Sequence, residues 1–349
     1  MKHTQEETIT ALQNAKGIAY YGEILLEVHS DKPLITSLRE AAHHQIDQLV
    51  PAGDVMNVLC NIDTLQRVFG DKLHAAFQQQ FIGPISIQDG LSSTLLKKLP
   101  FAAPQDCLVV NGEIGLCHLG VSPEGDMLIT LDTERAAIRD AINNILFKNT
   151  VVQEAQTNGI FFSTLIGLAM QRNHKEFTDM FNAIHHSGTV TVFDTNYRSY
   201  VMEHCYPQQN NRRAIEVMAD IIPNTDVLVA GSEDIFALEP EKERSIERAK
   251  DEFFNLVPLS SLCVLKAGKD GAYWRDGSGS WHHIPANPVN VRSTTGAGDA
   301  FNAGLLLAMR NGKNFKDAMT FAGVVASKIV ASNTSLLTIH EASDLVFVF

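Results

Sequence analysis

The chain has 349 residues, of which 45% are apolar and 19% are charged, and its formal net charge at pH 7 is −12. This balance is typical of a globular protein and excludes disordered and fibrous chains. A surface of that sign repels nucleic acid and anionic lipid, and no run rich in Lys and Arg offsets it locally. We therefore expect neither nucleic acid nor a membrane as a partner.

The N-terminus and the cysteines indicate a cytoplasmic protein. Residues 1–16 are polar and lack the apolar core of a signal peptide, and no run of 18 apolar residues is present to span a membrane. The 5 cysteines are odd in number, lie far apart and include no C-x-x-C pair, which favours reduced thiols over disulfides or a zinc site.

The first elements follow from apolar patterning. Residues 1–16 are predicted to form a loose helix or a tail. Residues 17–28 are a continuous apolar run with β-branched and aromatic members, which predicts one buried strand. Residues 34–49 are polar and show no clear period. A turn at 51–57 leads into a predicted helix that ends near Phe69.

The middle of the chain is predicted to contain a β-hairpin over 108–131, with turn residues at Ser122-Pro-Glu-Gly-Asp126. A helix is predicted over about 136–147. From residue 158 onward, strands and helices alternate regularly. The remaining predicted strands are 159–163, 190–194, 226–230, 262–266, 272–275 and 281–284, and the remaining predicted helices are about 175–186, 211–221, 299–311 and 315–331.

This alternation predicts the fold class. Strands that are almost continuously apolar and that alternate with helices indicate a mostly parallel sheet covered by helices on both faces. We therefore expect a doubly wound α/β domain. Ligands of such sheets bind in the crevice at the carboxyl ends of the strands.

The most informative stretch is Ser293-Thr-Thr-Gly-Ala-Gly-Asp-Ala-Phe-Asn-Ala-Gly304. Gly296-Ala-Gly298 is predicted to form a tight turn that leads directly into an apolar helix. The first N–H groups of a helix have no internal partners and carry positive potential, so small residues here predict an anion site. Asp299 stands at the helix start. It could simply cap the helix, but a cap explains neither the two glycines nor the small Ala300.

Thr294-Thr-Gly-Ala-Gly-Asp-Ala-Phe301 resembles the C-terminal signature of the ribokinase-like sugar kinases, also called the phosphofructokinase-B type. The resemblance implies that Asp299 takes the proton from the attacking hydroxyl. It also implies that the turn Gly296, Ala297 and Gly298 stabilises the transferred phosphoryl group, with ATP and Mg²⁺ as cofactors. Such a site suits phosphoryl transfer, in which catalysis is mostly positioning and electrostatic stabilisation.

Further matches follow in the family's order over roughly residues 18–335. Tyr21-Gly-Glu-Ile-Leu-Leu26 resembles the opening strand, and Ala52-Gly-Asp-Val-Met-Asn57 resembles the substrate loop, with Ala52 in place of a glycine. Phe193-Asp-Thr-Asn-Tyr-Arg198 resembles the Asp-x-Asn-x-Arg stretch of the 2-keto-3-deoxygluconate kinase branch. Val264-Leu-Lys-Ala-Gly-Lys-Asp-Gly271 resembles the strand and turn beside the nucleotide phosphates. Gly115-Leu-Cys-His-Leu119 with Glu124-Gly-Asp126 resembles a small β-lid over the sugar.

The resemblance assigns residues to three kinds of contact. Substrate contacts are implied for Gly53, Asp54, Asn57, Arg198 and Asp299, ATP contacts for Lys266, Gly268, Gly271, Gly296 and Gly298, and water-mediated Mg²⁺ contacts for Asp234 and Glu233. Simpler roles stay open for some of them. Asp54 and Asn57 could cap the helix that they start, Arg198 could be a surface residue, and Lys266 could be a solvated turn residue.

Four departures from the family pattern bear on the substrate and the metal. Ser293 stands where potassium-activated relatives have Asp, so we do not expect strong activation by a monovalent cation. Gly231-Ser-Glu-Asp234 replaces Asn-x-x-Glu. In the lid, Cys117 stands at the aromatic position of the Gly-Leu-Tyr of the keto-deoxy-gluconate kinases, Leu131-Asp-Thr133 replaces their Tyr-x-Arg, and Arg135 follows two residues later. Extra residues lie around 34–47 and 71–88.

We therefore predict one kinase domain over 17–335, with a β-lid from about 22–35 and 108–135, and a tail over 336–349. The predicted reaction is ATP-dependent phosphorylation of a primary hydroxyl of a small sugar or sugar acid, first of all 2-keto-3-deoxygluconate. A fructokinase or other hexose kinase is the second choice, and a catalytically silent sugar-binding protein is the alternative of a different class. The resemblance also implies a homodimer formed through the lid.

Overall fold

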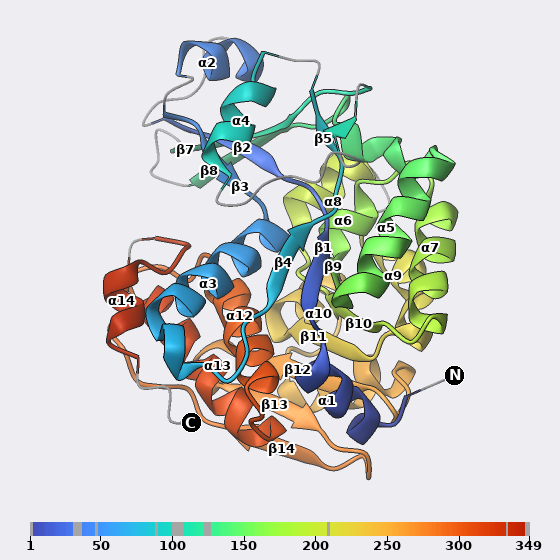
Figure 1. Ribbon diagram of the computed structural model, residues 1–349, viewed down its shortest axis with the longest axis vertical. Helices are drawn as coiled ribbons and strands as arrows, with labels where there is room; N and C mark the ends of the chain where they lie inside the picture. The colour runs from blue at the N-terminus through green and yellow to red at the C-terminus, as the bar shows by residue number, and fades with distance from the viewer. Residues whose placement is uncertain are drawn as a thin grey trace.

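The computed structural model describes residues 3–30, 37–45, 48–87, 90–99, 108–109, 111–121, 127–207, 210–332 and 334–345. Its main body is a large sheet between two layers of helices, and a smaller sheet with its own helices stands at one end (Figure 1). The mostly parallel α/β architecture predicted from the sequence is confirmed.

The large sheet has eight strands in the order β14-β13-β12-β11-β10-β9-β1-β4. Neighbours from β4 to β12 run parallel, whereas β13 and β14 form an antiparallel hairpin at one edge, as predicted. The strands are β1 Gly17–Tyr21, β4 Gln78–Phe81, β9 Gly159–Thr164, β10 Val190–Asp194, β11 Val227–Gly231, β12 Leu262–Lys266, β13 Ala272–Arg275 and β14 Trp281–Ile284.

Successive side chains of a strand point to opposite faces of the sheet, and two hydrophobic cores result. Ile18 and Tyr20 belong to the core beneath α1, α3, α12 and α13, whereas Ala19 and Tyr21 belong to the core beneath α5 to α10. The helices are α1 Gln5–Asn14, α3 Asp54–Phe69, α5 Ile145–Asn158, α6 Leu165–Ala169, α7 His174–His186, α8 Ser199–Cys205, α9 Asn210–Ala219, α10 Ser232–Leu238, α11 Ile246–Arg248, α12 Ala297–Arg310, α13 Phe315–Val330 and α14 Ile339–Ser343.

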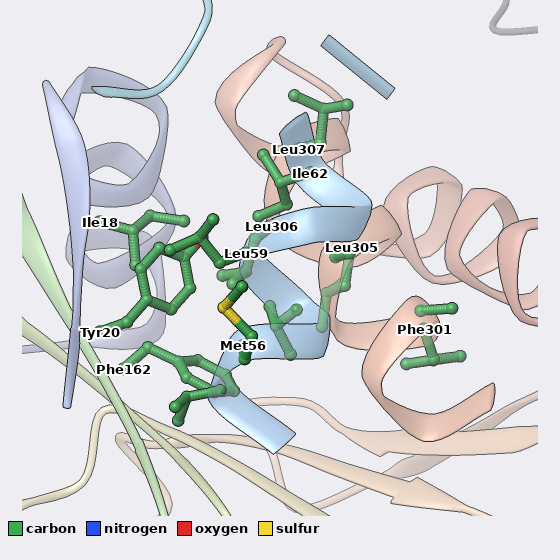
Figure 2. Packing of buried hydrophobic residues seen from close by; sticks show 14 of the residues in the cluster. Ile18, Tyr20, Met56, Leu59, Ile62, Phe162, Phe301, Leu305, Leu306 and Leu307 are labelled. Atoms are coloured by element: carbon green, nitrogen blue, oxygen red, sulfur yellow. The ribbon is translucent and has the colours of Figure 1, made fainter. Parts of the chain in front are cut away.

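The first core fixes α3 and α12 against each other (Figure 2). Met56, Leu59 and Ile62 of α3 lie between the sheet and the leucines 305–307 of α12, and all of these side chains are buried. Burying one side chain of this size is worth about 1.5–3 kcal/mol. Because the two helices share this core, their N-terminal turns are held side by side.

The single strand predicted over 17–28 is wrong. The chain leaves the large sheet after β1 and starts β2, Leu25–Ser30, in the small sheet. Gly22 makes this passage possible, because a Cβ at that position would stand 2.9 Å from Val55 Cγ2 of α3. Both segments are buried and apolar, so the hydrophobic pattern continues across the break.

The small sheet, which we call the lid sheet, has the order β3-β2-β7-β8. Its other strands are β3 Val50–Ala52, β7 Gly115–Val121 and β8 Met127–Asp132. The antiparallel pair β7 and β8 matches most of the predicted hairpin, but β6, Leu108–Val109, pairs with β5, Ile85–Ser86, instead. The predicted turn at 122–126 lies outside the described residues.

Two short helices, α2 Leu38–His44 and α4 Ser92–Lys98, pack on the lid sheet (Figure 1). Leu26, Leu38, Ala42 and Leu116 share one core there. Helix α2 lies in a segment without a predicted element, although Ser37 and Glu40 form a capping box at its start. The predicted domain limits and the lid-mediated dimer stay predictions.

The helix predicted over about 136–147 is also wrong. Residues Ala137–Arg139 and Ala141–Asn143 form short 3₁₀ turns, and α5 begins only at Ile145. The side chain of Asn144 accepts a hydrogen bond from Leu146 N at 2.9 Å and thereby starts the helix there. Within the described residues, no helix is both long and apolar enough to cross a membrane.

Candidate active site

Helix α12 begins two residues earlier than predicted. Gly296 is its N-cap, with φ 79°, so Asp299 is the third residue of the helix and no side chain caps the helix start. The amide of Ala297 donates to Thr294 O at 3.3 Å, whereas no described residue accepts from the amides of Gly298 and Asp299. These free amides, at the positive end of a helix, form an anion site.

Asp299 is buried beside a second carboxylate. Its side chain is 6% exposed, and Asn57 Nδ2 donates to Asp299 Oδ2 at 2.8 Å. Burial, followed by repulsion from Asp54, raises the pKa of Asp299 to about 7, although Asn57, Arg198 and Lys266 act in the opposite direction. A carboxylate that titrates near neutral pH is well matched to general-base work.

If Asp299 is the base expected from the sequence, the reaction should speed up with rising pH and level off above about pH 7, because a carboxyl accepts a proton only when ionised and the pKa of Asp299 is raised to about 7. The measurement is kcat/KM, which reports the free enzyme, from about pH 5.5 to about pH 9, with circular dichroism at each pH as the control for folding. A flat profile down to pH 5.5 would mean that the group that limits turnover titrates like an ordinary carboxylate, about pH 4.

The predicted substrate loop brings Asp54 and Asn57 to the same place. Gly53, with φ 127°, is the N-cap of α3, and a Cβ there would stand 2.5 Å from Glu23 O. Asp54 accepts from Val55 N at 2.7 Å and from Asn196 Nδ2 at 3.0 Å, so it has a local role at the helix start and a contact across the site.

Arg198 follows β10 and is half-buried. Burial lowers its pKa, but the carboxylates of Asp234, Asp299 and Asp54 more than compensate, so the pKa of Arg198 is raised. Within the described part of the chain, no carboxylate is close enough to form an ion pair with the guanidinium. Arg198 is therefore charged and available to an anionic ligand.

Three residues that the sequence reasoning did not assign to the site link these elements. Asp194 accepts from Lys266 Nζ at 2.7 Å and from Asn302 Nδ2, and Asn196 connects the same loop to Asp54. Asp194 and Asn196 belong to the Asp-x-Asn-x-Arg motif, so the motif itself was a signal for them. Asn302 follows Asp299 by three residues, which places both on one face of α12.

A cavity of about 650 Å³ adjoins the first turn of α12, because Ala297 and Gly298 are in its wall, whereas Asp54, Asn57 and Asp299 are not. Its wall includes the polar side chains of Arg198, Asp234 and Lys266 as well as Gly298. It also includes residues of the 285–291 loop and of helices α12 and α13, many of them apolar, among them Val289, Val291, Phe301, Met319 and Val330.

The predicted ATP residues Lys266, Gly268, Gly271 and Gly298 are all in the cavity wall. Gly296 is not in the wall but lies behind it, where a Cβ would stand 2.3 Å from Ser335 O. The nucleotide-sized cavity and the group of Asp54, Asn57 and Asp299 thus meet at the first turn of α12.

The two candidate magnesium residues differ in their surroundings. Asp234 is buried in the cavity wall, where Thr195 Oγ1 and Gly231 N both donate to its Oδ2 at 3.2 Å. Glu233 forms an ion pair with Arg244, and its side chain is 76% exposed. Among the described residues no three His, Cys, Asp or Glu side chains gather as a metal site. A hydrated Mg²⁺ held by one carboxylate and by phosphates fits Asp234 better than Glu233.

The lid sheet meets the body at α8. Thr133 Oγ1 and His204 Nε2 are 2.9 Å apart, and Leu131 and Tyr200 both pack against the second core. Burial raises the pKa of Tyr200 to about 12, and the charges of Arg198, Cys117 and Asp54 also act on this hydroxyl. Tyr200 therefore lies between the substrate loop and the lid, a placement that no sequence motif indicated.

The chain matches a family of carbohydrate kinases. The model of the pfkB family carbohydrate kinases matches residues 121–340, more than half of the chain, so the chain belongs to this family. It is an enzyme that phosphorylates a sugar, and ATP is the phosphoryl donor of its family. The recognition of this family from the sequence is confirmed.

Similar proteins agree with this family. A 2-dehydro-3-deoxygluconokinase of Haemophilus influenzae is 24% identical over 297 residues, which cover 83% of this chain and 86% of the relative. A 5-dehydro-2-deoxygluconokinase of Clostridium perfringens is 28% identical over 153 residues, and the match spans 42% of each chain.

Two solved structures show the same fold. A PfkB protein from Polaromonas has a TM-score of 0.70 at 16% identity and covers 95% of this chain and 100% of its own. An uncharacterized sugar kinase from Pyrococcus horikoshii in complex with ATP has a TM-score of 0.65 at 20% identity, covering 91% and 93%.

Proposed function

We propose that the protein transfers the γ-phosphoryl group of ATP to a primary hydroxyl of a small sugar or sugar acid, with Asp299 as the general base. One observation carries the proposal. The carboxylate of Asp299 and the free amides of Gly298 and Asp299 belong to the same helix turn, between a nucleotide-sized cavity and the substrate loop.

In this mechanism, Asp299 accepts the proton of the acceptor hydroxyl while the acceptor oxygen bonds to the γ-phosphorus. The bond from the γ-phosphorus to the bridging oxygen breaks, and ADP leaves with the electron pair. The free amides and Lys266 stabilise the charge on the phosphoryl group in transit. Mg²⁺, held through water by Asp234, would neutralise charge on the phosphates. The lid sheet would exclude water, the competing acceptor.

Our first choice of acceptor is 2-keto-3-deoxygluconate. The support is the Asp-x-Asn-x-Arg motif, the similarity to the 2-dehydro-3-deoxygluconokinase, and the half-buried Arg198, whose guanidinium suits a carboxylate through two parallel hydrogen bonds. A neutral hexose such as fructose is the second choice, because Cys117 and Leu131 stand where that branch has its lid aromatic residues. We also propose that the enzyme is cytoplasmic.

An ADP-release assay over a panel of sugars and aldonic acids tests both choices. We expect the highest kcat/KM for 2-keto-3-deoxygluconate. Arg198→Met should lower kcat/KM for the acid about 10-fold or more beyond its effect on a neutral hexose, because it removes a charge-assisted pair. Equal losses on both acceptors would contradict a carboxylate contact. No ADP release with any acceptor, while ATP still binds, would favour a silent sugar-binding protein.

A further inference from the structure

We infer that Asp194 is a positioning residue for phosphoryl transfer: it fixes Lys266 on the donor side of the α12 turn and the Asn196 loop on the acceptor side. The inference rests on the proposed role of Asp299. Asp194 itself does not contact the substrate. It holds in position the groups that do.

The contacts of Asp194 join three elements. The residue ends β10 and is 1% exposed. Its Oδ2 accepts from Lys266 Nζ at the end of β12 and from Asn302 Nδ2 of α12, and its Oδ1 accepts from Asn196 N at 3.2 Å. A buried carboxylate is costly unless it is paired and fully hydrogen-bonded. Here one carboxylate satisfies that need and thereby locks α12 to two strand ends.

On the donor side, Asp194 sets where the Lys266 ammonium points. A Cβ placed on Gly298 would stand 3.1 Å from Lys266 Nζ, so the ammonium lies beside Gly298, and both residues are in the cavity wall. Lysine has a long flexible side chain. Among the described residues, Asp194 is the one carboxylate that forms an ion pair with it.

On the acceptor side, Asp194 holds a strained loop. Asn196 has φ 26°, and it is the one residue other than glycine with positive φ in the described part of the chain. Such a backbone conformation persists where its surroundings enforce it. The bond from Asn196 N to Asp194 Oδ1 does so, and Asn196 Nδ2 then donates to Asp54 Oδ2 at 3.0 Å. The loop thereby positions Asp54, through this hydrogen bond, and Arg198, which follows Asn196 by two residues.

Asp194→Asn tests the inference, because it keeps the size of the side chain and removes its charge. We expect kcat to fall about 10- to 100-fold, as for a small misplacement of reacting groups, and KM for ATP to rise. We also expect the acid limb of the kcat/KM profile to move to lower pH. The charges that act on Asp299 are those of Asp54, Arg198 and Lys266. Without Asp194 the positive charge of Lys266 is no longer neutralised, so it lowers the pKa of Asp299 further.

Asp226→Asn is the matched control. Asp226 is a buried carboxylate of the same sheet that accepts from Thr191 N and Thr191 Oγ1, both at 2.9 Å, and from His185 Nδ1 at 3.2 Å. It precedes β11, so it lies at the end of the sheet away from the site. We expect this variant to lower Tm but to leave kcat, KM and the pH profile within about twofold.

A double-mutant cycle with Lys266→Met shows whether Asp194 acts through the lysine. We expect Asp194→Asn to change KM for ATP much less in the Lys266→Met background than in the wild type. Additive effects would overturn the donor-side part, and an Asp194→Asn variant that behaves like Asp226→Asn would overturn the inference altogether.

Two further readouts keep these outcomes apart. Asp299→Asn tests the proposed base by itself: if that variant is inactive while Asp194→Asn is nearly normal, only the positioning role fails.

If Asp194→Asn does not fold, Lys266→Met tests the donor-side part of the inference in its place. It should raise KM for ATP and move the acid limb to higher pH, because Lys266 lowers the pKa of Asp299. Unchanged values would overturn the inference.

Discussion

Asp299→Asn is expected to lower kcat by about 10²-fold or more, the range for loss of a positioned general base, while ATP still binds. Asparagine has the size of aspartate and can still accept the hydrogen bond from Asn57, so the α12 turn and its free amides should stay in place. What the variant loses is the ability to take a proton. The measurements are kcat in the ADP-release assay and the ATP dissociation constant by calorimetry.

The same variant should be more stable than the wild type although it is less active. Burial raises the pKa of Asp299 from 3.8 to about 7, so the folded protein keeps this proton at a pH where the unfolded chain has lost it. The fold therefore loses stability as the pH rises from about 4 to about 7, and the full penalty is present above about pH 7. Asp299→Asn should raise Tm at pH 8 relative to the wild type. Near-normal turnover of this variant would remove Asp299 from the role of base.

The sequence was informative where the residues that carry the chemistry and the residues that determine the backbone conformation are neighbours in the chain. Two glycines, a carboxylate and an apolar run within eight residues predicted the α12 turn, and the apolar strands predicted the parallel sheet. The helix start was misplaced by two residues for a physical reason. The N-cap is Gly296, whose left-handed backbone favours glycine, whereas the prediction placed Asp299 at the helix start because aspartate is a common N-cap.

Contacts between distant segments could not be predicted from local patterns. Asp194 is 72 residues from Lys266 and 108 residues from Asn302, so only the sheet order brings them together. The break at Gly22 was missed for the related reason that both strands beside it are equally buried. Tyr200 was missed because its role depends on where the lid sheet lies.

Gly296→Ala and Gly312→Ala form a matched pair at the two ends of α12. Both glycines have nearly the same left-handed backbone, with φ 79° and φ 78°. A Cβ on Gly296 would stand 2.3 Å from Ser335 O and 2.8 Å from Ser335 Cα, whereas a Cβ on Gly312 would meet nothing within 4 Å. The two substitutions therefore share the cost of the backbone conformation and differ in the clash.

We expect Gly312→Ala to cost about 1–2 kcal/mol, the penalty of a left-handed conformation for an L-residue, and to leave kcat unchanged. Gly296→Ala should destabilise the protein by more than this and lower kcat by about 10²-fold, because relief of the clash shifts the free amides away from the phosphoryl group. Urea unfolding and kcat measure the two effects. Equal changes in unfolding free energy and in kcat for both variants would mean that the segment around Ser335 moves to relieve the clash. The position of the free amides would then not depend on Gly296.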